Sequence, residues 1–144
     1  MVQIAVRQLD PELPLPVTSH AGDAGVDLYA RQDVIIAPAG GRVLLPTGIA
    51  IAIPNGYVGL VVPRSGLAIN HGVTLVNTPG IIDSGYRGEL QVVMINTDPL
   101  LPYHVTRGDR IAQLMIQRSE TVTWTPVDEL DDNDRGGGFG HSGR

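Results

Sequence analysis

Glycine and proline interrupt this sequence at short intervals along most of its length. The chain contains 18 Gly and 11 Pro. Before residue 110, few stretches of about ten residues are free of both and also repeat apolar residues with the 3.6-residue period of a helix. Short strands joined by turns tolerate such interruptions. The chain is therefore predicted to be almost entirely β, with residues 65–71 as a place where a short helix can form.

Short apolar runs, several of them alternating with polar residues, mark the candidate strands. In residues 48–53 the side chains of Ile49, Ile51 and Ile53 share one face of such a strand. Many short strands at this spacing predict an all-β fold, a jelly-roll-like barrel or sandwich with at most one short helix. The candidate strands are residues 2–6, 34–36, 42–45, 48–53, 57–62, 73–76, 89–96, 104–106, 111–117 and 121–125.

The last part of the chain differs in character from the rest. An acidic run from residue 128 to residue 134 is followed by a glycine-rich segment, residues 135–144. A segment of this composition buries too little apolar surface to order itself. The remainder has the length of a single domain. We therefore expect one β domain over residues 1–130 and a flexible glycine-rich tail over residues 131–144.

Charge and composition exclude several classes of function. The net charge is −5, and the 10 basic residues, all Arg, form no stripe, so sustained binding to duplex nucleic acid is not expected. The absence of cysteine rules out disulfides and thiolate metal sites. The sequence shows neither a signal peptide nor a run approaching the ~20 apolar residues of a membrane span. We expect a soluble cytoplasmic protein with no membrane partner.

Polar residues that can carry chemistry gather in the turns between apolar strands. Arg64, Ser65 and Gln113 offer donors for phosphate oxygens, and Gly66 lets the backbone approach a ligand closely. In residues 80–90 the carboxylate of Asp83 stands close to an aromatic ring in a glycine-rich bend. That arrangement suits a water held beside a stacked sugar, but the spacing alone favours an ordinary hairpin with Asp83 as a turn former.

Five sequence motifs in a fixed order contain most of these candidate residues. They are AGDAGVDLYA at 21–30, PRSGLA at 63–68, NTPGIIDSGYRGEL at 77–90, GDRIAQL at 108–114 and RGGGFGHSG at 135–143. Together they closely resemble the trimeric dUTPase family of the bacterial type, nearly from end to end. The resemblance implies the dUTPase-like fold and hydrolysis of dUTP to dUMP and pyrophosphate. This activity limits uracil incorporation into DNA and supplies dUMP for dTMP synthesis.

The resemblance also implies roles for residues in the reaction. Asp83 would be the general base that orients the attacking water. A Mg²⁺ cofactor would be held mainly by the triphosphate and waters rather than directly by the protein. Asp27 would act in the outer shell of that ion or orient an arginine. The phosphates would be held by Arg64, Ser65, Gly66 and Gln113.

Nucleoside recognition and the tail follow from the same resemblance. Asn77 and a strand backbone would read uracil, and Tyr86 would pack on the deoxyribose and leave no room for a 2′-hydroxyl. The tail would close as a lid, with Arg135 on the phosphates and Phe139 stacked on uracil. This tail has one residue fewer between Arg135 and Phe139 than is usual in the family. The family also implies a homotrimer in which each active site is shared between chains.

Three other functions compete with this interpretation. A dCTP deaminase has a similar fold, but it carries a catalytic glutamate in the strand after the hairpin, where this chain has Val93. A non-catalytic nucleotide-binding jelly roll would be expected to lose Asp83 or the tail motif, and both are present. A capsid or lectin jelly roll is allowed by the fold alone, but it leaves the five blocks unexplained.

Overall fold

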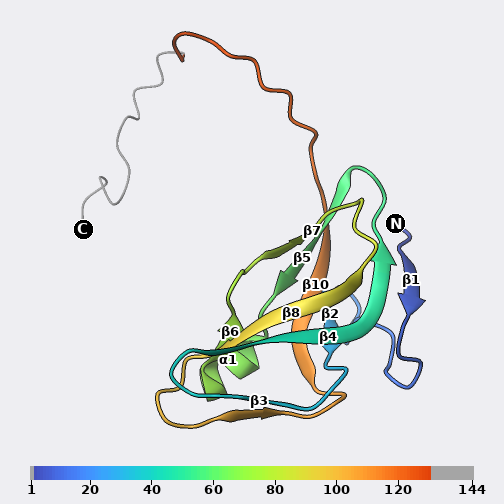
Figure 1. The fold of residues 1–144 in the computed structure, drawn as a ribbon. Coiled ribbons are helices and arrows are strands. Elements are labelled where there is room, and N and C mark those ends of the chain that lie inside the picture. The colour runs from blue at the N-terminus through green and yellow to red at the C-terminus, as the bar shows by residue number, and fades with distance from the viewer. Residues whose placement is uncertain (1, 131–144) are drawn as a thin grey trace.

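Strands dominate the computed structural model of this chain, which describes residues 2–130 (Figure 1). One short helix, α1, accompanies them. The elements in chain order are β1 (Ala5–Gln8), β2 (Gly25–Tyr29), β3 (Val34–Ile36), β4 (Gly41–Ala52), β5 (Tyr57–Val62), α1 (Ser65–His71), β6 (Val73–Leu75), β7 (Gly80–Ile82), β8 (Glu89–Asn96), β9 (Tyr103–Val105) and β10 (Arg110–Arg118). The all-β prediction, including the short helix over residues 65–71, is confirmed.

Two four-stranded sheets form the body of the protein. Their strand orders are β1-β4-β8-β6 and β2-β10-β5-β7, and β3 pairs separately with β9. All of these pairs are antiparallel. Most neighbours within the sheets are far apart along the chain, as expected for a jelly-roll-like sandwich.

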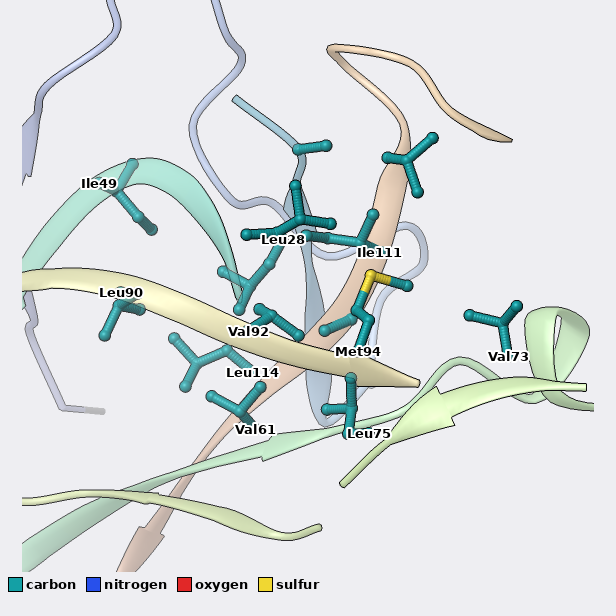
Figure 2. Close-up of a cluster of buried hydrophobic side chains, with 14 of the residues drawn as sticks. Leu28, Ile49, Val61, Val73, Leu75, Leu90, Val92, Met94, Ile111 and Leu114 are labelled. Carbon is teal, nitrogen blue, oxygen red and sulfur yellow. The ribbon is translucent and has the colours of Figure 1, made fainter. Parts of the chain in front are cut away.

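The core fills the space between the two sheets. Side chains of β8, such as Val92 and Met94, meet Val61 of β5 and Leu114 of β10 (Figure 2). Along β8 buried residues alternate with more accessible ones, because successive side chains of a strand point to opposite faces. The core residues that are almost fully buried include Leu28, Ile36, Leu45, Ile49, Ile53, Val73, Leu90 and Ile111.

The structure changes four of the predicted strands by more than one residue and identifies two strands that were not predicted. Residues 121–125 are exposed and form no strand, so that prediction was wrong. The strand predicted at residues 2–6 begins later, as β1. Residues 42–45 and 48–53 belong to one bent strand, β4. The unpredicted strands β2 and β7 each contain a glycine and depend on pairing with β10 and β5, respectively.

A bulge bends β4 and interrupts its pairing with β8. The first half of β4 pairs with β8, whereas its second half pairs with β1 along one edge and, at Ala50, still with β8 along the other. The register shifts between Pro46 and Ala50, and Gly48 within the bulge has a φ of 77°, which favours glycine. The carboxylate of Glu89 accepts the Gly48 N–H at 2.8 Å, and Thr47 donates its hydroxyl to the Leu90 carbonyl at 2.8 Å.

A network of charged side chains ties the segment after β1 to this bend. Arg31 lies 3.2 Å from Glu89 and 3.8 Å from Asp10, while Arg107 contacts both Asp10 and Glu12 at 2.9 Å. Desolvation raises the pKa of Asp10, but the hydrogen bond from Arg107 and the backbone N–H of Glu12 outweigh it, so the pKa lies below its ordinary value. The network joins segments that are distant in sequence.

Asn96 at the end of β8 provides a test of this architecture. Its fully buried amide donates to the carbonyls of Ile36 at 3.2 Å and Leu101 at 2.8 Å and accepts the Asp98 N–H at 3.0 Å. Asn96→Ala leaves these backbone groups without partners, so we expect it to lower the free energy of unfolding by about 2–4 kcal/mol. Urea denaturation measures this. The control Asn70→Ala changes an exposed residue, and equal urea midpoints for the two variants would contradict the prediction.

Candidate active site

Strand β7 and the turn that joins it to β8 form one half of the candidate site. β7 pairs with β5 and is the last strand of its sheet within residues 2–130. Its outer edge therefore presents backbone N–H and C=O groups to a ligand. The chain then turns through Asp83, whose carbonyl accepts the Tyr86 N–H at 3.0 Å, before it returns as β8. This turn leaves Asp83 exposed.

Two adjoining hollows lie along β7 and this turn and share Ile81, Ile82 and Gln91 in their walls. The first is also lined by Asn77, and the second by Asp83 and Tyr86. We call the two hollows together the hairpin groove. Three of the residues that the sequence suggested, the amide, the carboxylate and the aromatic ring, therefore lie along one groove.

Tyr86 closes the second hollow from one side. Its phenol donates a hydrogen bond to the Glu89 carbonyl at 2.9 Å, and 43% of the residue stays exposed. The ring is thus held at the rim of the groove and remains accessible to a ligand.

Asp27 is the centre of the other half of the site, which we call the arginine cluster (Asp27, Arg64, Arg110 and Gln113). The Asp27 side chain is only 8% exposed. Its Oδ1 lies 3.0 Å from Arg64 Nε, an ion pair whose N–H is not aimed for a hydrogen bond. Its Oδ2 accepts from Arg110 Nη1 at 3.3 Å, and Arg64 also donates to the Arg110 carbonyl at 3.2 Å.

Strand pairing explains why these residues meet. Gln113 of β10 lies opposite both Asp27 of β2 and Val62 of β5. Residues directly opposite each other in neighbouring strands point to the same face of the sheet. Arg64 follows two residues after Val62 and occupies the N-cap position of α1. A Cβ atom on Gly66 in that helix would meet nothing within 4 Å, so the helix leaves open space there.

The hairpin groove and the arginine cluster are not brought together within one chain. Ile82 lies opposite Gly59 near the start of β5, whereas Arg64 follows the far end of that strand. A strand rises about 3.3 Å per residue, so the five steps along the chain from Gly59 to Arg64 place Ile82 and Arg64 roughly 16 Å apart. Figure 1 shows the turn after β7 and helix α1 at opposite ends of the molecule. The suggested tail residues Arg135 and Phe139 lie outside the described residues.

Arg110 belongs to the arginine cluster, and Gln91 lines the hairpin groove. The sequence did not single out either residue for a role with substrate. Arg110 stands in the block GDRIAQL, but only the pairing of β10 with β2 brings it to Asp27. Gln91 is a polar residue in an apolar strand, and that break in the pattern is the signal that can identify it.

Two general features of the described part of the chain bear on ligands. Within residues 2–130 no group of three or more His, Asp or Glu side chains lies close enough to hold a metal ion. No helix in that range has the length and apolar character that a membrane crossing needs.

Comparison with known proteins shows one consistent similarity. The model of the dUTPase family matches residues 12–143. A protein of Thermobifida fusca named deoxyuridine 5'-triphosphate nucleotidohydrolase is 57% identical over 143 residues, which is 99% of this chain and 79% of that protein. A protein of the same name from Corynebacterium glutamicum is 56% identical over 145 residues, 100% of this chain and 97% of that protein.

Solved structures agree with the sequence comparison. The dUTPase of Staphylococcus bacteriophage 80alpha, solved with dUpNHpp, superposes with a TM-score of 0.91 over the full length of both chains at 28% identity. A mutant dUTPase from phage phi11 of S. aureus has a TM-score of 0.82 at 28% identity, over 90% of this chain and 99% of that chain, and it is described as coordinating a structural Mg(II) ion.

The arginine cluster can be tested without any ligand. Asp27→Asn removes the charge that balances Arg64, whose side chain is only 24% exposed. We expect the free energy of unfolding to fall by about 2 kcal/mol, because a poorly solvated cation loses its partner. Urea denaturation in EDTA measures this effect and prevents any role in metal binding from contributing. Asp23→Asn, in an exposed turn, is the matched control. Equal losses of unfolding free energy in the two variants would contradict the prediction that Asp27 stabilises the protein through Arg64.

Proposed function

The chain belongs to the dUTPase family and hydrolyses dUTP to dUMP and pyrophosphate, and we propose that the hairpin groove of one subunit and the arginine cluster of another form each active site. The observation that carries this proposal is the lining of the groove. Asn77, Asp83 and Tyr86 border two adjoining hollows beside the open edge of β7. An amide, a carboxylate and an aromatic ring in this order suit a base, a reacting phosphate and a sugar.

The first hollow suits recognition of uracil. Uracil presents an N–H at position 3 between two carbonyls, whereas cytosine has an acceptor at position 3 and an amino group at position 4. The backbone edge of β7 and the amide of Asn77 offer donors and acceptors that match uracil. A mismatched base leaves polar groups unpaired, and this loss produces strong selectivity.

The second hollow suits the sugar and the reacting water. The ring of Tyr86 and the side chain of Ile82 make an apolar surface for deoxyribose, and close packing there leaves no room for a 2′-hydroxyl. Asp83 accepts a proton from a water as that water attacks the α-phosphorus. A new P–O bond forms to the water oxygen, the P–O bond to the leaving group breaks, and pyrophosphate departs.

The arginine cluster, together with Ser65 and Gly66 at the start of α1, suits the triphosphate. Arg64, Ser65, Gly66 and Gln113 offer charged, hydroxyl, backbone and amide donors. Arg64 is held by Asp27 and by the Arg110 carbonyl, so its guanidinium is oriented before substrate binds. Donors fixed in advance neutralise the charge that develops as pyrophosphate leaves.

Magnesium fits this arrangement as an ion held through the substrate. Mg²⁺ prefers oxygen ligands, retains several waters and is usually bound by few carboxylates together with phosphates. Both oxygens of Asp27 already lie beside arginines, which supports its role in orienting Arg64. When bound, the ion supplies positive charge beside the phosphates.

A homotrimer brings the two halves together. Asp83 and Arg64 lie beside opposite ends of β5, so a complete site needs residues of more than one chain. The outer face of the β1-β4-β8-β6 sheet supports assembly, because Leu44 and Val76 are exposed there and Val93 and Ile95 point to the same side. An apolar sheet face of this kind is typical of subunit interfaces.

The tail completes the proposed site. The match to the family model extends to residue 143 and so includes the block with Arg135 and Phe139. We propose that residues 131–144 act as a lid over the bound nucleotide, with Arg135 on the phosphates and Phe139 on uracil. Such a lid excludes water from the reacting centre.

In the cell, dUTP hydrolysis limits uracil incorporation into DNA and supplies dUMP for dTMP synthesis. We propose that the enzyme acts in the cytoplasm on free nucleotides, without a nucleic-acid or membrane partner. A dCTP deaminase is not supported, since the family match is to dUTPases and Val93 replaces the glutamate that deamination requires.

The role of Asp83 predicts a specific catalytic defect. Asp83→Asn keeps the shape of the side chain but removes the base, so we expect kcat for dUTP to fall at least ~10²-fold. Affinity for dUpNHpp, measured by calorimetry, should change little. Ser84→Ala, next to it in the turn, is the control and should retain activity. Unchanged turnover in Asp83→Asn would remove this residue from the mechanism.

The shared site predicts complementation between inactive chains. Asp83→Asn and Arg64→Ala should each be nearly inactive alone, but co-expression of differently tagged chains should produce mixed trimers with some intact sites. Random equimolar mixing should restore roughly a quarter of wild-type activity if each site takes the two residues from different chains.

The control for this experiment co-expresses Asp83→Asn with the double variant Asp83→Asn/Arg64→Ala, which leaves no intact site in any assembly. Activity in the control would expose a preparation artefact. If the test mixture stays inactive although mixed trimers are isolated, the two halves do not come from different chains.

A further inference from the structure

Gly88 stands where the phenol of Tyr86 folds back over the chain. A Cβ atom built on Gly88 would lie 2.5 Å from the Tyr86 hydroxyl oxygen, 2.7 Å from Cζ and 3.2 Å from Cε2. Real Cβ atoms are essentially never found closer than 3.0 Å to such neighbours. The ring can hold its present position only because residue 88 has no side chain.

The backbone does not require glycine at this position. The glycines with positive φ in the described part of the chain are Gly22, Gly40, Gly48, Gly56, Gly72 and Gly108, and Gly88 is not among them. Other residues can adopt its backbone conformation without strain. The requirement for glycine at position 88 therefore comes from the space that the Tyr86 ring occupies.

The carbonyl that accepts the hydrogen bond of the Tyr86 phenol is fixed in place, because it belongs to Glu89. The phenol donates to the Glu89 carbonyl at 2.9 Å. The Glu89 carboxylate in turn contacts Arg31 at 3.2 Å and accepts the Gly48 N–H at 2.8 Å, and Glu89 pairs with Ala50 of β4. The acceptor of the phenol is therefore fixed to the sheet. Gly88 and the Glu89 carbonyl together form a seat for the ring.

This seat determines the position of the Tyr86 ring in the wall of the second hollow. Tyr86 lines that hollow with Ile82 and Asp83, and the same face is proposed above to pack on the sugar. We propose that Gly88 is a specificity-determining positioning residue, which excludes ribonucleotides by allowing Tyr86 to sit against Glu89. This inference rests on the proposed role of Tyr86.

A side chain at position 88 should move the ring rather than the backbone. The atoms that a Cβ would strike belong to the far end of the Tyr86 side chain, which can rotate away. Gly88→Ala should therefore fold, lose the hydrogen bond to the Glu89 carbonyl and release the ring from the seat. Loss of close packing on the sugar should then admit UTP.

The experiment measures kcat/KM for dUTP and for UTP in four variants of the full chain and in the wild type. The variants are Gly88→Ala, Tyr86→Ala, their double variant, and Gly85→Ala as the control. Gly85 lies in the same turn, and a Cβ there would meet nothing within 4 Å. The selectivity ratio, dUTP over UTP, should fall about tenfold or more in Gly88→Ala and in Tyr86→Ala, and stay at the wild-type value in Gly85→Ala.

The double variant separates an effect through Tyr86 from a direct effect of Gly88. If Gly88 acts only through the ring, the double variant should have the same ratio as Tyr86→Ala. Any loss of thermal stability in Gly88→Ala should also be relieved in the double variant, because the clashing phenol is gone. A further fall in the ratio, or a stability loss that persists, would overturn the proposal.

The single variants distinguish failure of this inference from failure of the proposed sugar site. If Tyr86→Ala relaxes selectivity but Gly88→Ala does not, Gly88 does not position the ring, and the sugar site stands. If Tyr86→Ala keeps the wild-type ratio, the role of Tyr86 fails, and the inference on Gly88 fails with it. Hydrolysis of dUTP by the wild type is measured in the same assay and is independent of both results.

Discussion

The Glu89 carboxylate joins parts of this protein that would otherwise be independent. It accepts the N–H of Gly48 in the bulge of β4 and contacts Arg31, which also approaches Asp10 after β1. The bulge lies in the long strand β4, which pairs with β8 along one edge and, in its second half, with β1 along the other. The carbonyl of Glu89 then receives the phenol of Tyr86. A half-buried charge with several partners is stable here because each partner compensates for lost hydration.

The candidate active site depends on where the strands end rather than on the core itself. β7 is short and lies at the edge of its sheet within the described residues, so the backbone groups on its outer edge can pair with a ligand. In the proposed site, selectivity for a base comes from the geometry of this pleated edge, which a rigid sheet holds in place. The turn beyond β7 adds Asp83 and Tyr86, which belong to the second hollow.

The separation of the hairpin groove from the arginine cluster has a simple structural origin. Antiparallel pairing sends the turn after β7 to one end of β5 and leaves Arg64 at the other. A single chain can therefore be well folded while each half of its site lacks the other. In the proposed trimer, assembly creates the complete site, and folding and catalysis become linked through the subunit interface.

The sequence by itself determined the all-β class, the short helix at residues 65–71 and the family, because turn residues, periodicity and ordered motifs are local properties. It did not predict β2 or β7, and it wrongly predicted a strand at residues 121–125. Short strands exist only where a partner pairs with them, and that pairing joins residues distant in sequence. Only the tertiary structure brought Arg110 to Asp27, placed Gly88 beneath Tyr86 and separated Asp83 from Arg64, because strand register decides which side chains meet.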